Sequence, residues 1–135
     1  MDITDTDLLL LVEDDDVDAM IFERAIGQID PDIRVIRAEN GAQAIEMLAT
    51  ERPNLIVMDI RMPKMDGKEA LKLIKQDESL RKIPVIMMST SAQAEDIDYC
   101  YKNYTNAYLV KPLETDESQN VIKKLIDFWF GATKR

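Results

Sequence analysis

The chain has 135 residues, which allows one domain with a sizeable core and leaves little room for a second folded unit. Its 26 acidic and 17 basic residues give a net charge of −9, which argues against direct binding to nucleic acid or to anionic membranes. The absence of histidine excludes histidine-based catalysis and metal ligation, and a single cysteine, Cys100, cannot form an internal disulfide. We therefore expect a cytoplasmic protein, with no secretion signal in residues 1–7 and no membrane-spanning run.

The first part of the chain alternates strand and helix signals. Residues 8–12 are a continuous aliphatic run closed by four acidic residues, which predicts a strand buried on both faces. Apolar residues at positions 17, 20, 21 and 25 then predict a helix that stops at Gly27. A weaker strand signal spans 33–36, and a second helical pattern over 42–49 follows the turn at Asn40–Gly41.

The rest of the chain repeats this alternation. Aliphatic runs at 55–58, 85–88 and 107–110 predict three more buried strands. A helical pattern follows each strand: apolar residues recur at 70, 71 and 74, at 97 and 101 within the segment 92–104, and at 122, 125, 126 and 129. The chain thus has five strand–helix units in succession.

Alternating buried strands and amphipathic helices predict an α/β fold, with a parallel sheet covered by helices on both faces. Five units indicate the flavodoxin-like (βα)5 arrangement, a doubly wound parallel sheet with strand order 2-1-3-4-5. In such a sheet, ligands bind beyond the carboxyl ends of the strands, at the switch point between the first and third strands.

Carboxylates are concentrated at this predicted switch point. Glu13 and Asp14 follow the first strand, and Asp59 follows the third. Crowded carboxylates repel each other, and a hard divalent cation such as Mg²⁺, which binds carboxylate, water and phosphate oxygens, relieves that repulsion. For the next residues, Asp15 and Asp16, we expect helix capping instead.

Ser89 follows the fourth strand and Lys111 the fifth, so that a hydroxyl and an ammonium group join the same edge. Taken alone, Ser89 is also typical of a turn at the end of a strand, and Lys111 of a solvated surface lysine. Lysine is a point charge well suited to a phosphate oxygen. Together with the acidic cluster, the two residues predict a site for a metal ion and a transferred phosphoryl group.

Four segments resemble the signatures of the receiver domain of two-component response regulators: Val12–Asp15, Val57–Gly67, Met88–Ser91 and Val110–Pro112. The intervals of 45, 30 and 22 residues that separate Asp14, Asp59, Ser89 and Lys111 also agree with the family. The resemblance covers about residues 8–130 and implies one stand-alone receiver domain over 1–135, with no output domain.

A weaker resemblance connects the chain to response regulators paired with bacterial phytochromes. It rests on Asn106-Ala107-Tyr108, on Trp129 and on the acidic start of the first helix.

The receiver resemblance assigns the acidic residues to phosphorylation and metal binding. It implies that Asp59 accepts phosphate from a sensor histidine kinase or a histidine phosphotransfer protein. It further implies that Asp14 binds Mg²⁺ directly, that Glu13 holds the metal through water, and that Arg61 contributes its backbone carbonyl. Mn²⁺ is an alternative ion. The protein is then not an enzyme, except toward its own phosphorylation and dephosphorylation.

The resemblance also implies roles for residues at the ends of the last two strands. Ser89 matches the hydroxyl that hydrogen-bonds the phosphoryl group, and Lys111 matches the lysine that pairs with it, its bond to Pro112 being typically cis. Tyr108 matches an aromatic switch that turns inward as the hydroxyl moves. Arg61 and Ser91 match positions that tune phosphoryl lifetime. Neither offers a carboxylate or amide to orient water, so we expect slow to moderate autodephosphorylation.

The signalling surface is expected on the fourth helix, the fifth strand and the fifth helix, where an unknown downstream protein binds and a homodimer forms. Val121 and Phe128 are seven residues apart, so they share a helix face outside the predicted core stripe. Tyr101 and Tyr104 would extend this apolar surface toward Tyr108. The alternative is that the last helix is simply buried more deeply.

Three other classes remain open from the residues alone. A phosphatase of the haloacid dehalogenase type requires a second aspartate two residues after the nucleophile, where this chain has Arg61. A flavodoxin-like flavin carrier usually has a first loop rich in Ser, Thr and Gly, whereas residues 13–16 are all acidic. A receiver that is folded but not phosphorylated is the third, and the complete set of acids, hydroxyl and lysine argues against it.

Overall fold

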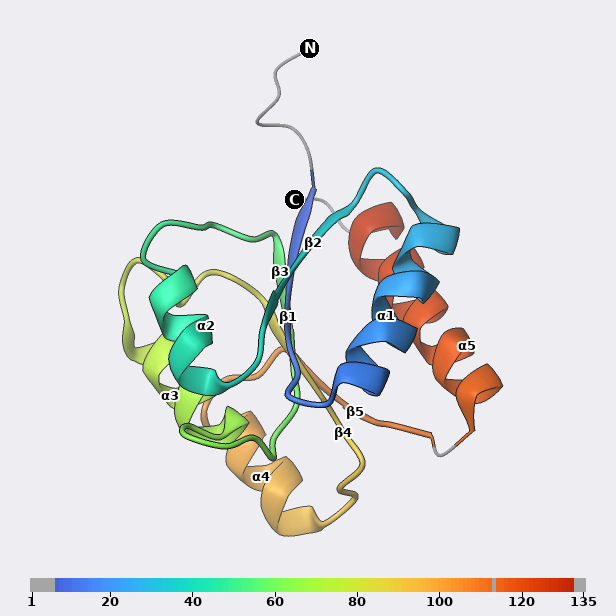
Figure 1. Ribbon diagram of the computed structural model, residues 1–135. Helices are drawn as coiled ribbons and strands as arrows, with labels where there is room; N and C mark the ends of the chain where they lie inside the picture. Colours follow the sequence, from blue (N-terminus) through green and yellow to red (C-terminus); the bar gives the residue numbers. More distant parts are fainter. Residues whose placement is uncertain (1–6, 113, 133–135) are drawn as a thin grey trace.

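The computed structural model describes residues 7–112 and 114–132. Its centre is a five-stranded parallel sheet in the order β2-β1-β3-β4-β5, which confirms the predicted topology (Figure 1). The strands are β1 (Leu8–Val12), β2 (Arg34–Ala38), β3 (Leu55–Met58), β4 (Val85–Ser89) and β5 (Ala107–Val110). The second strand begins one residue later than predicted and reaches Ala38.

Helices cover both faces of the sheet. They are α1 (Asp16–Ile29), α2 (Gly41–Met47), α3 (Gly67–Gln76), α4 (Ala94–Lys102) and α5 (Thr115–Ile126), which continues into a π-helical turn (Asp127–Ala132). Helices α1 and α5 pack against each other on one face, and α2, α3 and α4 lie on the other (Figure 1). In the described part of the chain, no helix is long and apolar enough to cross a bilayer.

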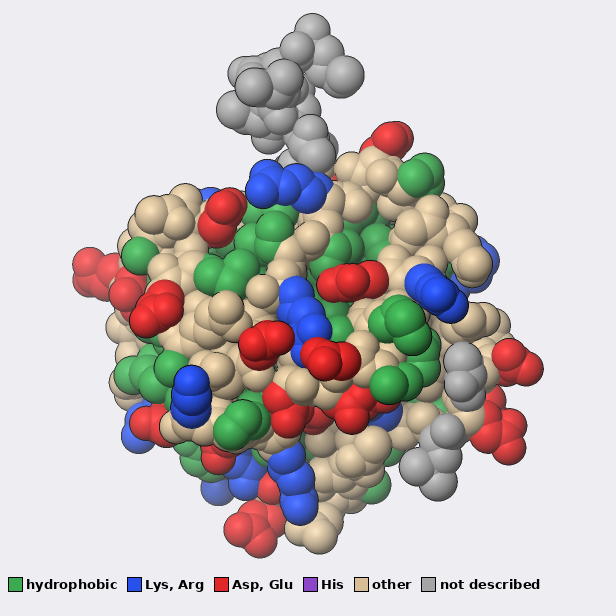
Figure 2. Space-filling model, viewed as in Figure 1, with side chains coloured by type: hydrophobic (Ala, Val, Ile, Leu, Met, Phe, Trp, Pro, Cys, Tyr) green, Lys and Arg blue, Asp and Glu red, His purple; other side chains and the backbone are tan. Residues whose placement is uncertain are grey.

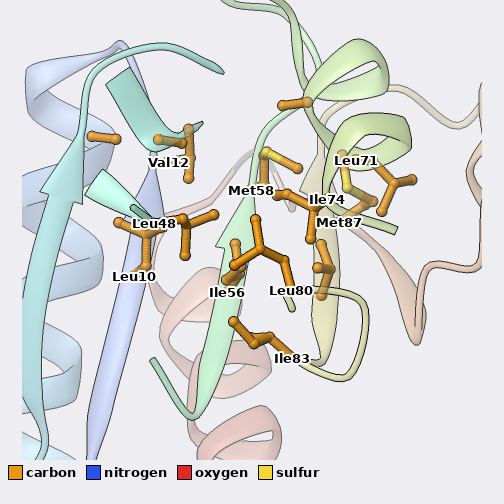
Figure 3. Packing of buried hydrophobic residues seen from close by; sticks show 14 of the residues in the cluster. Leu10, Val12, Leu48, Ile56, Met58, Leu71, Ile74, Leu80, Ile83 and Met87 are labelled. Atoms are coloured by element: carbon orange, nitrogen blue, oxygen red, sulfur yellow. The ribbon is translucent and has the colours of Figure 1, made fainter. Parts of the chain in front are cut away.

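Strand β1 shows why the sequences of the strands are unbroken aliphatic runs. Leu10 and Val12 point into the core beneath α2 and α3 (Figure 3), whereas Leu9 and Leu11 point into the core beneath α1 and α5. Alternate side chains of a strand point to opposite faces, so a strand covered on both sides must be apolar throughout. Burying one such side chain contributes about 1.5–3 kcal/mol.

The prediction for α1 was wrong in two respects. The helix passes through Gly27 and closes only where the Asp30 N–H donates to the Ile26 carbonyl, since glycine in a helix interior costs only about 1 kcal/mol. Val17 and Met20 are 59% and 44% exposed, so they are not core residues. The helix packs on the sheet through a neighbouring face. The buried residues of this face are Ala19, Phe22, Ala25 and Ile26.

Candidate functional site

The structure brings Glu13, Asp14 and Asp59 together at the carboxyl ends of β1 and β3. Each offers one carboxylate oxygen, and these three oxygens lie within 4.8 Å of one another. The strand register causes this approach, because Val12 is aligned with Met58 and the Asp59 N–H donates to the Val12 carbonyl at 3.0 Å. Acidic side chains also crowd the middle of the face that Figure 2 turns toward the reader. Such a set of oxygen donors fits a hard divalent cation.

Lys111 is the counter-charge of this cluster. Its Nζ lies 2.5 Å from Glu13 Oε1, 3.2 Å from Asp59 Oδ2 and 3.5 Å from Asp18 Oδ2. Burial alone would lower the pKa of Lys111, but the hydrogen bond to Glu13 and the neighbouring charges of Asp59 and Asp18 raise it above its ordinary value. Lys111 is therefore a fixed positive charge at neutral pH.

Glu13 is the buried member of the cluster, at 3% exposure. Burial raises its pKa to about 7, although the hydrogen bond and charge of Lys111 act in the opposite direction. The Glu13 carbonyl accepts hydrogen bonds from Arg37 Nε and Nη2 at 3.0 and 2.9 Å, and Arg37 Nη1 lies 3.0 Å from Asp16. Arg37 thus holds the acidic loop against β2. Sequence reasoning missed it because the predicted strand ended at position 36.

Helix capping was expected for both Asp15 and Asp16, and only Asp15 provides it. Asp15 is the N-cap of α1, and its Oδ1 accepts from the Asp18 N–H at 2.9 Å, which confirms the capping prediction. Asp16 lies in the first turn and pairs with Arg37, so it is not the cap.

Gly67 brings the start of α3 against the backbone of Asp59. Its N–H donates to the Ile60 carbonyl at 2.7 Å, and a Cβ added to Gly67 would lie 2.0 Å from the Asp59 carbonyl oxygen. Arg61, two residues beyond Asp59, is exposed on the loop between β3 and α3. The close approach of α3 thus fixes the backbone on which Asp59 sits.

Ser89, Ser91 and Tyr108 form one hydrogen-bonded chain. Ser89 is 1% exposed at the end of β4, and its Oγ accepts from the Ser91 N–H at 3.1 Å. The Tyr108 hydroxyl donates to the Ser91 carbonyl at 2.8 Å, so this side chain already lies against the loop between β4 and α4. Burial raises the pKa of Tyr108. The Lys111–Pro112 bond is trans, unlike the typical family feature, and the small preference between isomers of such bonds allows either.

Asp96 extends this chain toward α3, and nothing in the sequence singled it out. It is 7% exposed, accepts from Ser91 Oγ at 2.5 Å, and lies 2.6 Å from Lys68 Nζ. The hydrogen bonds from Lys68 and Ser91 lower the pKa of the Asp96 carboxyl. The buried residues of helix α4 are Asp96 and Cys100. Tyr101, which belongs to the apolar pattern that predicted this helix, is 50% exposed. A buried, paired aspartate looks like any surface acid in a sequence.

The predicted interface residues divide into two groups. Tyr101, Tyr104 and Phe128 are 50%, 75% and 58% exposed. Val121 was expected to be exposed, but it is half-buried and packs against the core beneath α1 and α5. Val121 instead lines an apolar groove together with Leu109 of β5.

Comparison with known proteins agrees with this architecture. The sequence model of the response regulator receiver domain matches residues 9–123. Response regulator Rcp1 of Synechocystis is 31% identical over 129 residues, covering 90% of this chain and 88% of Rcp1. The probable methanogenesis regulatory protein FilR2 of Methanothrix harundinacea is 33% identical over 130 residues, covering 92% of this chain and 84% of FilR2.

Solved structures give the same result. The phosphorylated cyanobacterial phytochrome response regulator RcpA superimposes with a TM-score of 0.90 at 30% identity, covering 95% of this chain and 96% of RcpA. The Mn²⁺-bound form of Rcp1 gives a TM-score of 0.89 at 30% identity, covering 95% of this chain and 97% of Rcp1. With its sheet order, its acidic cluster and these relatives, the chain belongs to the family of response regulator receiver domains.

Proposed function

We propose that the chain accepts a phosphoryl group on Asp59 from a sensor histidine kinase or a histidine phosphotransfer protein, in a reaction that requires Mg²⁺ or Mn²⁺. The observation that carries this proposal is the convergence of Glu13, Asp14 and Asp59 around Lys111. An Asp59 oxygen attacks phosphorus in line, the bond from phosphorus to the donor breaks, and an acyl phosphate forms.

The donor set supports a resident divalent cation. Glu13, Asp14 and Asp59 supply oxygen ligands whose charges repel one another, and the resemblance adds the backbone carbonyl of Arg61. When bound, the ion neutralises charge on the phosphoryl oxygens. The manganese-bound structure of Rcp1, a relative with this fold, supports the same assignment here.

The chain's own residues then carry the signal. Phosphorylation adds negative charge at Asp59, Lys111 pairs with a phosphoryl oxygen, and the Ser89 hydroxyl donates to another. Because the Ser91 N–H bonds to Ser89 Oγ and the Ser91 carbonyl holds the Tyr108 hydroxyl, a shift of Ser89 disturbs both contacts. The readout is a changed surface on α4, β5 and α5, which a downstream protein or a second copy of the chain recognises.

Arg61 and Ser91 are proposed to tune the lifetime of the acyl phosphate. The Ser91 hydroxyl already donates to Asp96 at 2.5 Å, and Arg61 is a cation, so neither orients a water for attack on phosphorus. A slow to moderate loss of phosphate is the expected consequence.

Incubation with acetyl phosphate and Mg²⁺ should add one phosphoryl group to the wild-type chain, as measured by intact mass. Removing the metal with a chelator should prevent the addition, and Asp59→Asn should abolish it because an amide oxygen is a poor nucleophile. The exposed Asp32→Asn serves as the matched control and should be phosphorylated normally. Labelling that survives Asp59→Asn, or phosphate that is stable to hydroxylamine, would contradict the proposal.

Light scattering tests the proposed homodimer. Beryllofluoride, which mimics the phosphoryl group, should convert wild-type protein from monomer to dimer, and Phe128→Asp should weaken the dimer by about tenfold or more. Phe128 is the exposed aromatic residue beside the groove between β5 and α5, so a charge there is buried on association. Met20→Asp on α1 is the control, since Met20 is exposed and does not line this groove. Wild-type protein that stays monomeric in every state would refute the dimer.

A further inference from the structure

Asp18 is a fourth carboxylate at the site, and the metal cluster does not include it. Its Oδ2 lies 3.5 Å from Lys111 Nζ, and its side chain is 46% exposed. It lines the same cavity of about 190 Å³ as Glu13, Asp59 and Lys111. The carboxylate oxygens that lie within 4.8 Å of one another come from Glu13, Asp14 and Asp59, and Asp18 is not part of that group.

The first turn of α1 holds the backbone that carries this carboxylate. The Asp18 N–H is held by the side chain of the N-cap residue, Asp15, at 2.9 Å. Asp16 is two residues earlier in the same turn, and its carboxylate faces Arg37 at 3.0 Å rather than Lys111. The turn therefore presents two aspartates of equal charge to two different cations. This makes Asp16 a matched control for Asp18.

We propose that Asp18 acts through Lys111. Its carboxylate competes with the phosphoryl group for the Lys111 ammonium and thereby lowers the affinity of the site for that group. The inference rests on the proposed acceptance of a phosphoryl group at Asp59. Lys111 has three N–H donors, and at rest they face Glu13, Asp59 and Asp18. A phosphoryl oxygen must take one of these positions, and the negative charge of Asp18 also repels the incoming anion.

The affinity for beryllofluoride isolates this effect, because beryllofluoride binds without being hydrolysed. In saturating Mg²⁺, Asp18→Asn should lower the Kd for beryllofluoride about two- to fivefold by calorimetry, the size expected for one partly exposed charge. The difference should shrink at high salt, which screens exposed charges. Asp18→Glu keeps the charge and should stay near wild type, whereas Asp16→Asn should change the Kd much less.

Two results would overturn the inference about Asp18, and a third would contradict the proposed function. An Asp18→Asn variant with a lower Tm and an unchanged Kd would show that Asp18 only stabilises the start of α1 through the helix dipole, and would overturn the inference. A large loss of Mg²⁺ affinity, measured without beryllofluoride, would assign Asp18 to the metal and would also overturn it. Wild-type protein that binds no beryllofluoride would contradict the proposed function itself.

Discussion

Replacing Gly67 by alanine should lower the free energy of unfolding by about 2–4 kcal/mol and abolish phosphorylation of Asp59. The added Cβ would lie 2.0 Å from the Asp59 carbonyl oxygen and 2.9 Å from the Ile60 Cα. Both neighbours are backbone atoms, so no rotamer change can relieve the clash. Either α3 or the end of β3 must move, and Asp59 then loses its alignment with Glu13 and Asp14.

Gly27→Ala is the control for this substitution. Gly27 lies inside α1 on an exposed surface, and a Cβ there meets no atom within 4 Å. Alanine should therefore raise the free energy of unfolding by about 0.5–1 kcal/mol, because it costs less backbone entropy on folding. Denaturant unfolding of both variants, together with intact-mass phosphorylation assays, measures the two effects. A Gly67→Ala protein with wild-type stability and normal phosphorylation would contradict the steric argument.

The sequence predicts the sheet and the convergence of the acids because both follow from the aliphatic strand pattern and the usual strand order of such a sheet. Strands that are buried on both faces must be aliphatic, and strands β1 and β3 are neighbours in a sheet wound in this order. The residues that follow Val12 and Met58 therefore meet at one edge, as Glu13 and Asp59 do.

What the sequence could not predict depends on how the helices are rotated on the sheet. Apolar residues occur around most of α1, so the pattern does not distinguish the exposed Val17 from the buried Phe22. The same holds for Val121, whose burial depends on how closely α5 approaches β5. Asp96 was missed for a related reason, since its partner Lys68 lies on another helix and is adjacent only in the folded chain.

Removing Lys111 should lower stability and weaken phosphoryl binding, while metal binding stays near normal or becomes somewhat tighter. Lys111→Ala leaves the buried Glu13 without its cation, and loss of one partner of a buried ion pair costs about 3–5 kcal/mol. We expect a lower Tm in the presence of a chelator, with much of the loss restored by Mg²⁺, which supplies the missing positive charge. Lys111→Met, which keeps most of the apolar stem, separates lost charge from lost packing.

Mg²⁺ affinity in the Lys111→Ala protein should be near normal or somewhat tighter, because a charge that repels the metal ion is gone while Glu13, Asp14 and Asp59 remain. Beryllofluoride affinity should fall by more than about tenfold, since a charge-assisted hydrogen bond to the phosphoryl group is lost. Lys123→Ala is the control: its ion pair with Asp127 is exposed, so its removal should change stability by less than about 1 kcal/mol. A folded Lys111→Ala protein that has lost its affinity for Mg²⁺ would mean that Lys111 organises the metal ligands rather than the phosphoryl group.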